Sequence, residues 1–172
     1  MRVSALAFAL LTTPLAACDT SGGGGSPPEE TLAPLTVAHY RLPCASEPRQ
    51  LCLQVQGEGE GAFHDSSEIE GFDFIWGRQA RIVVRTLDSG ALMLEDVVSD
   101  TLDRDAFELP LTAGDFTVVN ATTLRLVDGT EATCATEDLC RIIVARMGQG
   151  AAVVRARAGA SAGDPLSLFR LM

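Results

Sequence analysis

The sequence contains no lysine, and all 13 of its basic side chains are arginine. Aspartate and glutamate together number 23, so the formal net charge is −10 at pH 7. A chain with this excess of negative charge is poorly suited to bind a nucleic-acid backbone, or to dock on anionic lipid by charge alone. We therefore expect no nucleic-acid partner.

Histidine is scarce as well, with only His39 and His64 in the chain. His64-Asp65-Ser66 contains the residue types of a hydrolytic triad. Neighbours in sequence rarely reach one another in triad geometry, however, and the chain has no nucleophile-elbow motif. We interpret His39 as a packed or surface residue of a strand. The sequence thus predicts a protein that is not an enzyme, with a hydrolase as the distant alternative.

The sequence also lacks a motif for a cofactor. Gly57, Gly59 and Gly61 superficially resemble a phosphate-binding loop, but Glu58 and Glu60 alternate with them. Those carboxylates would repel phosphate, and neither a lysine nor a helix start follows. We expect no cofactor and no resident metal.

A hydrophobic run long enough to span a membrane is missing as well. Residues 3–11 are apolar except for Ser4, which is far short of the ~20 residues that a spanning helix needs. The run follows a single positive charge at Arg2 and ends at Thr12-Thr13-Pro14. This arrangement is typical of the hydrophobic region of a signal peptide.

The next residues, Leu15-Ala16-Ala17-Cys18, resemble the lipobox of bacterial lipoproteins. The resemblance implies that the signal peptide, residues 1–17, is removed and that Cys18 carries the acyl chains. An ordinary secreted protein cleaved after Ala17 is the alternative. Residues 18–34 then form a tether rich in glycine, serine and proline, which spans on the order of 20 Å as a flexible coil. We expect a protein anchored by lipid in a bacterial cell envelope, with its body in the periplasm or at the cell surface.

Four cysteines remain once Cys18 is assigned to lipid: Cys44, Cys52, Cys134 and Cys140. In an oxidising compartment, each close pair is most simply a local disulfide. A zinc site is the rival interpretation, but the spacing within each pair is wider than structural zinc sites usually have.

The rest of the chain predicts an all-β fold. Residues 51–56 and 81–85 alternate apolar with polar or basic side chains, as half-buried strands do. Turn signals such as Asp88-Ser89-Gly90 separate the apolar runs, and we find no capped helical repeat between them. Ile142, Val144 and Arg146 are accordingly expected to form one face of a strand.

The two cysteine loops resemble each other in sequence. Cys44-Ala45-Ser46-Glu47 before Leu51-Cys52 corresponds to Cys134-Ala135-Thr136-Glu137 before Leu139-Cys140. We interpret this as a degenerate tandem duplication, with chance similarity among short β segments as the alternative. The predicted organisation is a β unit at 35–100, a connector at 101–115 and a second, degenerate unit at 116–172. We expect two small β-meander or barrel units, which either lie side by side or merge into one barrel or sandwich.

The first unit carries a more specific pattern. Cys44 to Cys52 runs into Leu53-Gln54-Val55, followed by Ile69-Glu70-Gly71-Phe72 and the strand at 81–85. These motifs resemble a bacterial family described as domain of unknown function 4377, whose members occur in lipoproteins. The chain departs from that pattern at Phe63, where the family commonly has tryptophan, and the second unit lacks the Ile-Glu-Gly-Phe segment. The resemblance implies a fold and a location but no activity.

Two features are candidates for binding a partner. Phe72, Phe74 and Trp76 alternate, so we expect them to share one face of a strand, either in the core or as an exposed patch with Trp76 outermost. The acidic segment 57–73, which includes Glu58 and Glu60, is expected to be a solvated loop, because it lacks the spacing of a calcium-binding loop; a calcium site is the alternative. We expect a binding module for an envelope protein or a cell-wall component. The alternative is an inhibitor-like module that presents the Cys44–Cys52 loop to an envelope enzyme.

Overall fold

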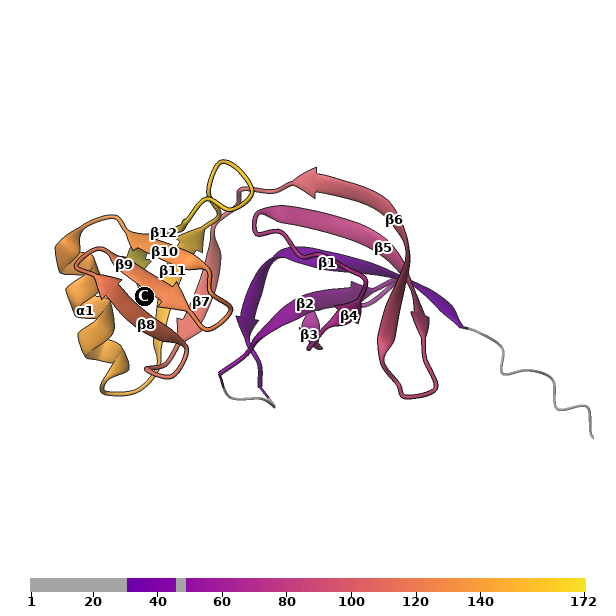
Figure 1. Cartoon of the computed structure of the whole chain (residues 1–172), viewed down its shortest axis with the longest axis horizontal. Helices are drawn as coiled ribbons and strands as arrows, with labels where there is room; N and C mark the ends of the chain where they lie inside the picture. The colour runs from indigo at the N-terminus through magenta and orange to yellow at the C-terminus, as the bar shows by residue number, and fades with distance from the viewer. Residues whose placement is uncertain (1–30, 46–48) are drawn as a thin grey trace, which may run out of the picture.

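The computed structural model describes residues 31–45 and 49–172. The predicted signal peptide, Cys18 and most of the predicted tether lie outside these residues. The described part forms twelve strands and one helix, arranged as two six-stranded curled sheets side by side (Figure 1). The predicted class, a β fold of two similar units in tandem, is confirmed. Within the described residues, no helix is both long enough and apolar enough to cross a bilayer.

The first unit is the sheet β3-β2-β1-β5-β6-β4. Alternation in the sequence places Val37, Leu53 and Ile82 in its core, where each is at most 1% exposed. The predicted strands at 51–56 and 81–85 are thus confirmed. Its strands are β1 Leu32–Pro43, β2 Leu51–Gly57, β3 His64–Ser66, β4 Ile69–Glu70, β5 Arg78–Thr86 and β6 Leu92–Leu102.

Strand β1 is irregular in its second half, and this irregularity joins the two units. Its pairing with β2 shifts register between Val37 and Arg41. A shift of this kind bends a strand and re-aims its side chains. Val37 accordingly packs in the core of the first unit, whereas Tyr40 and Leu42 pack against the core of the second.

The second unit is the sheet β7-β11-β12-β10-β9-β8, with the helix α1 packed on it. Its core contains Leu109, Leu124, Ile143 and Leu168, all fully buried. The elements are β7 Phe107–Leu111, β8 Phe116–Asn120, β9 Thr123–Leu126, β10 Glu131–Cys134, α1 Glu137–Met147, β11 Ala152–Arg157 and β12 Leu166–Leu171.

The strand expected around Ile142 and Val144 is wrong, because this segment is helix α1. The Thr136 side chain caps its first turn by accepting a hydrogen bond from the Leu139 backbone N–H at 3.1 Å. Acidic residues occupy the first turn and Arg146 the last, which suits the helix dipole. The buried face consists of Cys140, Ile143 and Met147, at helical spacing.

The unit boundaries also differ from those expected. Strand β7 lies inside the predicted connector 101–115 and pairs with β11, so it belongs to the second sheet. Strand β6 extends to Leu102, which leaves only residues 103–106 between the sheets. The cysteine loops differ as well: the first leads into strand β2, whereas the second leads into α1.

Candidate functional site

The two units meet at a cluster of aromatic rings around Phe107, a buried residue of β7. The Tyr40 ring stacks on Phe107 with centroids 5.0 Å apart, and the Trp76 ring stacks on it at 5.8 Å. Trp76 Nε1–H also donates a hydrogen bond to Thr130 Oγ1 at 2.9 Å. Residues of the first unit therefore cover the core of the second, and the junction is a packed interface.

His39 lies in the same junction and is 7% exposed. Its Nδ1 is 3.1 Å from Asp103 Oδ2, and its Nε2–H donates to the backbone carbonyl of Asp105 at 3.2 Å. The ring also meets Tyr40 and Phe107 edge-on. His39 is thus a packed residue of β1 that ties this strand to the short connection between the units.

The segment with Phe72, Phe74 and Trp76 is not a strand, and the expectation of one was wrong: β4 ends at Glu70, and residues 72–75 have no regular structure. The alternation itself holds, because the three aromatic side chains are half-buried while Asp73 and Ile75 between them are exposed. Phe72 and Phe74 pack on the core of the first unit and Trp76 on that of the second. Of the two expected alternatives, the three aromatic residues therefore follow core packing.

The acidic segment 57–73 is spread along the surface. Glu58 and Glu60 are exposed, and the Glu60 carboxylate accepts a hydrogen bond from the Gly57 N–H at 2.7 Å and lies 3.4 Å from His64 Nδ1. The Asp65 carboxylate accepts hydrogen bonds from Gln54 Nε2 and the Ala45 N–H instead of facing His64. Among the described residues, no three or more His, Cys, Asp or Glu side chains are grouped as metal ligands.

Both predicted disulfides are present. Cys44 pairs with Cys52 and Cys134 with Cys140, with Cα–Cα distances of 5.0 Å and 5.5 Å. The first bridge ties the end of β1 to β2, and the second ties β10 to the first turn of α1. All four cysteines named as disulfide partners are therefore committed to the fold.

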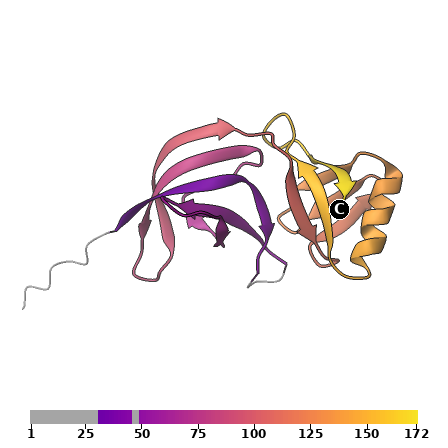
Figure 2. The same cartoon turned by 180° about the vertical axis from the view of Figure 1, so that it is seen from behind.

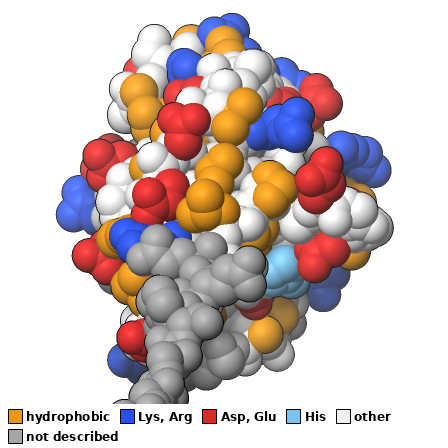
Figure 3. Space-filling view, turned by 90° about the vertical axis from the view of Figure 1, so that its right-hand side faces the viewer, with side chains coloured by type: hydrophobic (Ala, Val, Ile, Leu, Met, Phe, Trp, Pro, Cys, Tyr) orange, Lys and Arg blue, Asp and Glu red, His pale blue; other side chains and the backbone are white. Residues whose placement is uncertain are grey.

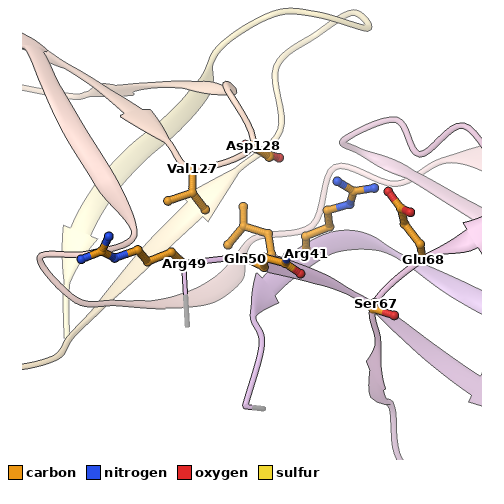
Figure 4. Close-up of a pocket in the computed structure, with 8 residues that line it drawn as sticks. Arg41, Arg49, Gln50, Ser67, Glu68, Val127 and Asp128 are labelled. Carbon is orange, nitrogen blue, oxygen red and sulfur yellow. The ribbon is translucent and has the colours of Figure 1, made fainter. Parts of the chain in front are cut away.

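A polar cleft of about 390 Å³ opens beside the junction (Figure 4). Arg41, from the irregular half of β1, points into it, and Glu68 of the acidic segment points toward Arg41 from the side of the first unit. The second unit contributes the turn after β9. The lining residues are Arg41, Arg49, Gln50, Leu51, Ser67, Glu68, Val127 and Asp128.

Arg41 is the distinctive group of this cleft. Its guanidinium carbon lies 4.6 Å from the centre of the Phe74 ring, over the ring face. Its Nε is buried and has no hydrogen-bond partner among the described residues, and no ion pair within that part of the chain involves it. Burial lowers the pKa of Arg41 below its ordinary value, and the charges of Asp128 and Glu68 partly offset that effect.

The cleft therefore offers a cation with unused hydrogen-bonding capacity, flanked by two acidic side chains. A guanidinium binds a carboxylate through paired, charge-assisted hydrogen bonds. Within the described part of the chain, neither Asp128 nor Glu68 forms an ion pair with Arg41. Asp128 Oδ1 accepts a hydrogen bond from the Thr130 N–H at 3.0 Å, so its other oxygen and the Glu68 carboxylate remain for a donor or an ammonium group of a ligand. The arrangement suits a ligand that carries a carboxylate close to a hydrogen-bond donor.

Sequence reasoning missed Arg41 and Asp128, because they come together only through the packing of the two units. It did single out neighbours of the site: Glu68 belongs to the acidic segment and Phe74 to the aromatic segment. No family model, curated protein or solved structure matches the chain.

Proposed function

We propose that the protein is a lipid-anchored module of a bacterial cell envelope that binds a partner, without catalysis, through the cleft at the junction of its two units. The lipobox-like segment ending at Cys18 and the tether after it support the anchoring. The two disulfides fit an oxidising compartment such as the periplasm. The resemblance of the first unit to the unknown-function family found in lipoproteins points the same way.

The main support for a binding role is the position of Arg41 in the cleft. Arg41 lines the cleft, no ion pair within the described residues involves it, and a ligand carboxylate supplies the charge-assisted hydrogen bonds that its guanidinium is built to make. The partner is accordingly an envelope protein or a cell-wall component that presents a carboxylate beside an amine or amide. The non-catalytic role fits the histidines, because His39 is tied to the connection between the units and Asp65 is turned toward Gln54.

The test uses the Arg41 Nε–H as its own reporter in ¹⁵N NMR. A short peptide with a free terminal carboxylate is titrated against the same peptide with an amidated end. We expect a saturable shift of the Arg41 signal with the first peptide only. Arg41→Gln should abolish binding, whereas Arg170→Gln, at an exposed position far along the chain, should leave it unchanged. Equal shifts with both peptides, or equal binding by both variants, would rule out the proposed role of the cleft.

A second candidate is the inhibitor-like module. The base of the Cys44–Cys52 loop is held by the disulfide, by the Cys44 N–H to Gln50 carbonyl bond at 3.0 Å, and by the Ala45 N–H to Asp65. A loop fixed at its base loses little conformational entropy when an enzyme binds it. Inhibition of an envelope protease that disappears on reducing this disulfide would favour this function over the first.

A further inference from the structure

The second unit has an apolar groove that the proposed function does not use. It lies between helix α1 and the hairpin of β8 and β9, and its volume is about 460 Å³. Val118 and Leu124 line it from the sheet, and Cys140 and Val144 line it from the helix. Its lining is far more apolar than that of the cleft at Arg41.

The groove exists because α1 does not cover the whole sheet. The helix packs against β10, β11 and β12, whereas β9 and β8 continue the sheet beyond it. Val118 pairs with Leu124 across the two strands, so both side chains face the helix side of the sheet. Leu124 is fully buried, but Val118 is 57% exposed, which leaves an apolar step at the margin of the helix.

Strand β8 also ends the sheet. Its only strand neighbour in the described part of the chain is β9, so alternate backbone N–H and C=O groups on its outer edge have no strand partner. Such an edge is a template for one more strand. An extended peptide satisfies these groups, and every second side chain then points to the helix side, into the groove.

We propose that β8 and the groove bind an extended segment of a partner protein by strand addition, with its alternate apolar side chains seated between Val118 and α1. Arg141 also lines the groove, but it is paired with Asp138 at 2.7 Å, so Glu137 and the net charge of −10 favour a basic residue flanking that segment. Helix α1 and strand β8, which line the groove, lie at the end of the molecule opposite the start of β1 (Figures 1 and 2). A partner therefore reaches it on the side away from the lipid anchor, a point that rests on the proposed anchoring.

Figure 3 shows the opposite end of the molecule. There, hydrophobic side chains form a broken line among acidic and basic ones (Figure 3). Apolar exposure of this scattered kind is ordinary for a protein surface. Strand β6 of the first unit supplies a matched control for Val118, because Val98 is also 57% exposed.

The experiment measures binding of a fluorescent, end-blocked peptide of alternating valine and threonine with one terminal lysine. Fluorescence anisotropy is followed for the wild type, Val118→Arg and Val98→Arg. We expect saturable binding that Val118→Arg weakens about tenfold or more, while Val98→Arg leaves it unchanged. A peptide with the same side chains but N-methylated at every residue should not bind, because it has no backbone N–H donor left to pair with β8.

Four results would overturn the proposal. Three of them are no binding of the peptide at millimolar concentration, equal loss of binding in the two valine variants, and equal binding of the N-methylated peptide. A fourth is a wild-type dimer in sedimentation that Val118→Arg dissociates, since a second copy would then occupy the edge. Arg41→Gln should leave binding of this peptide unchanged, so failure at the groove is distinguishable from failure at the cleft.

Discussion

Replacing Gly77 with alanine tests how tightly the two units are packed. Gly77 has a φ of +80°, and a Cβ built on it would lie 2.6 Å from the Cβ of Ala158 in the second unit. The segment cannot easily move away, because the Gly77 N–H donates to the His39 carbonyl and the Asp103 N–H donates to the Gly77 carbonyl, both at 2.8 Å. The substitution therefore adds a backbone strain and a steric clash.

The size of the effect follows from these two contributions. An alanine held at positive φ costs about 1–2 kcal/mol, and forcing an extra methyl group into a packed site costs about 1–3 kcal/mol. We expect Gly77→Ala to lower the free energy of unfolding by roughly 2–5 kcal/mol. Gly90 is the matched control, because its φ is +82° but nothing lies within 4 Å of the position of its Cβ. Gly90→Ala should lose only the strain, about 1–2 kcal/mol.

Urea unfolding followed by far-UV circular dichroism and by Trp76 fluorescence measures both variants. Combining Gly77→Ala with Ala158→Gly removes the clash but keeps the strain, so the double-mutant cycle should show a favourable coupling between the two positions. If Gly77→Ala is no more destabilising than Gly90→Ala, or if the coupling is zero, the units do not pack as closely as we describe.

Three further predictions concern local features of the fold. Thr136→Ala should lower the free energy of unfolding by about 1 kcal/mol, because it removes the N-cap of α1, and no loss in urea unfolding would contradict the cap. Replacing Cys134 and Cys140 together by serine should cost roughly 2–3 kcal/mol from loop entropy, as measured by the same method; an unchanged midpoint would contradict it. Trp76 emission should be blue-shifted and weakly quenched by iodide, because the ring stacks on Phe107; strong quenching would place it in solvent.

Local patterns in the sequence predicted several strands and both disulfides, because these features depend on residues that are close in the chain. Period-2 alternation identified the strands at 51–56 and 81–85, and close spacing identified both disulfides. The helix was missed although its signals are present: Thr136 as a cap, acidic residues after it, and buried side chains at helical spacing. The likeness of the two cysteine loops outweighed them, since the first loop leads into a strand.

The candidate site was beyond the reach of such patterns. The concentration of aromatic residues around Trp76 was visible in the sequence, but its role depends on Phe107, which no nearby motif marks. Arg41 resembles any other arginine of a strand until the bend of β1 and the docking of the second unit bury its Nε. Contacts between distant segments decide both features, and a single sequence does not encode them locally.

The most direct test of the proposed envelope lipoprotein is the intact mass of the protein extracted from membranes of its own cells with detergent. We expect a chain that begins at Cys18, carries a diacylglyceryl group there, and has its four other cysteines oxidised. A mass that corresponds to a chain still beginning at Met1, without a lipid adduct, would contradict it.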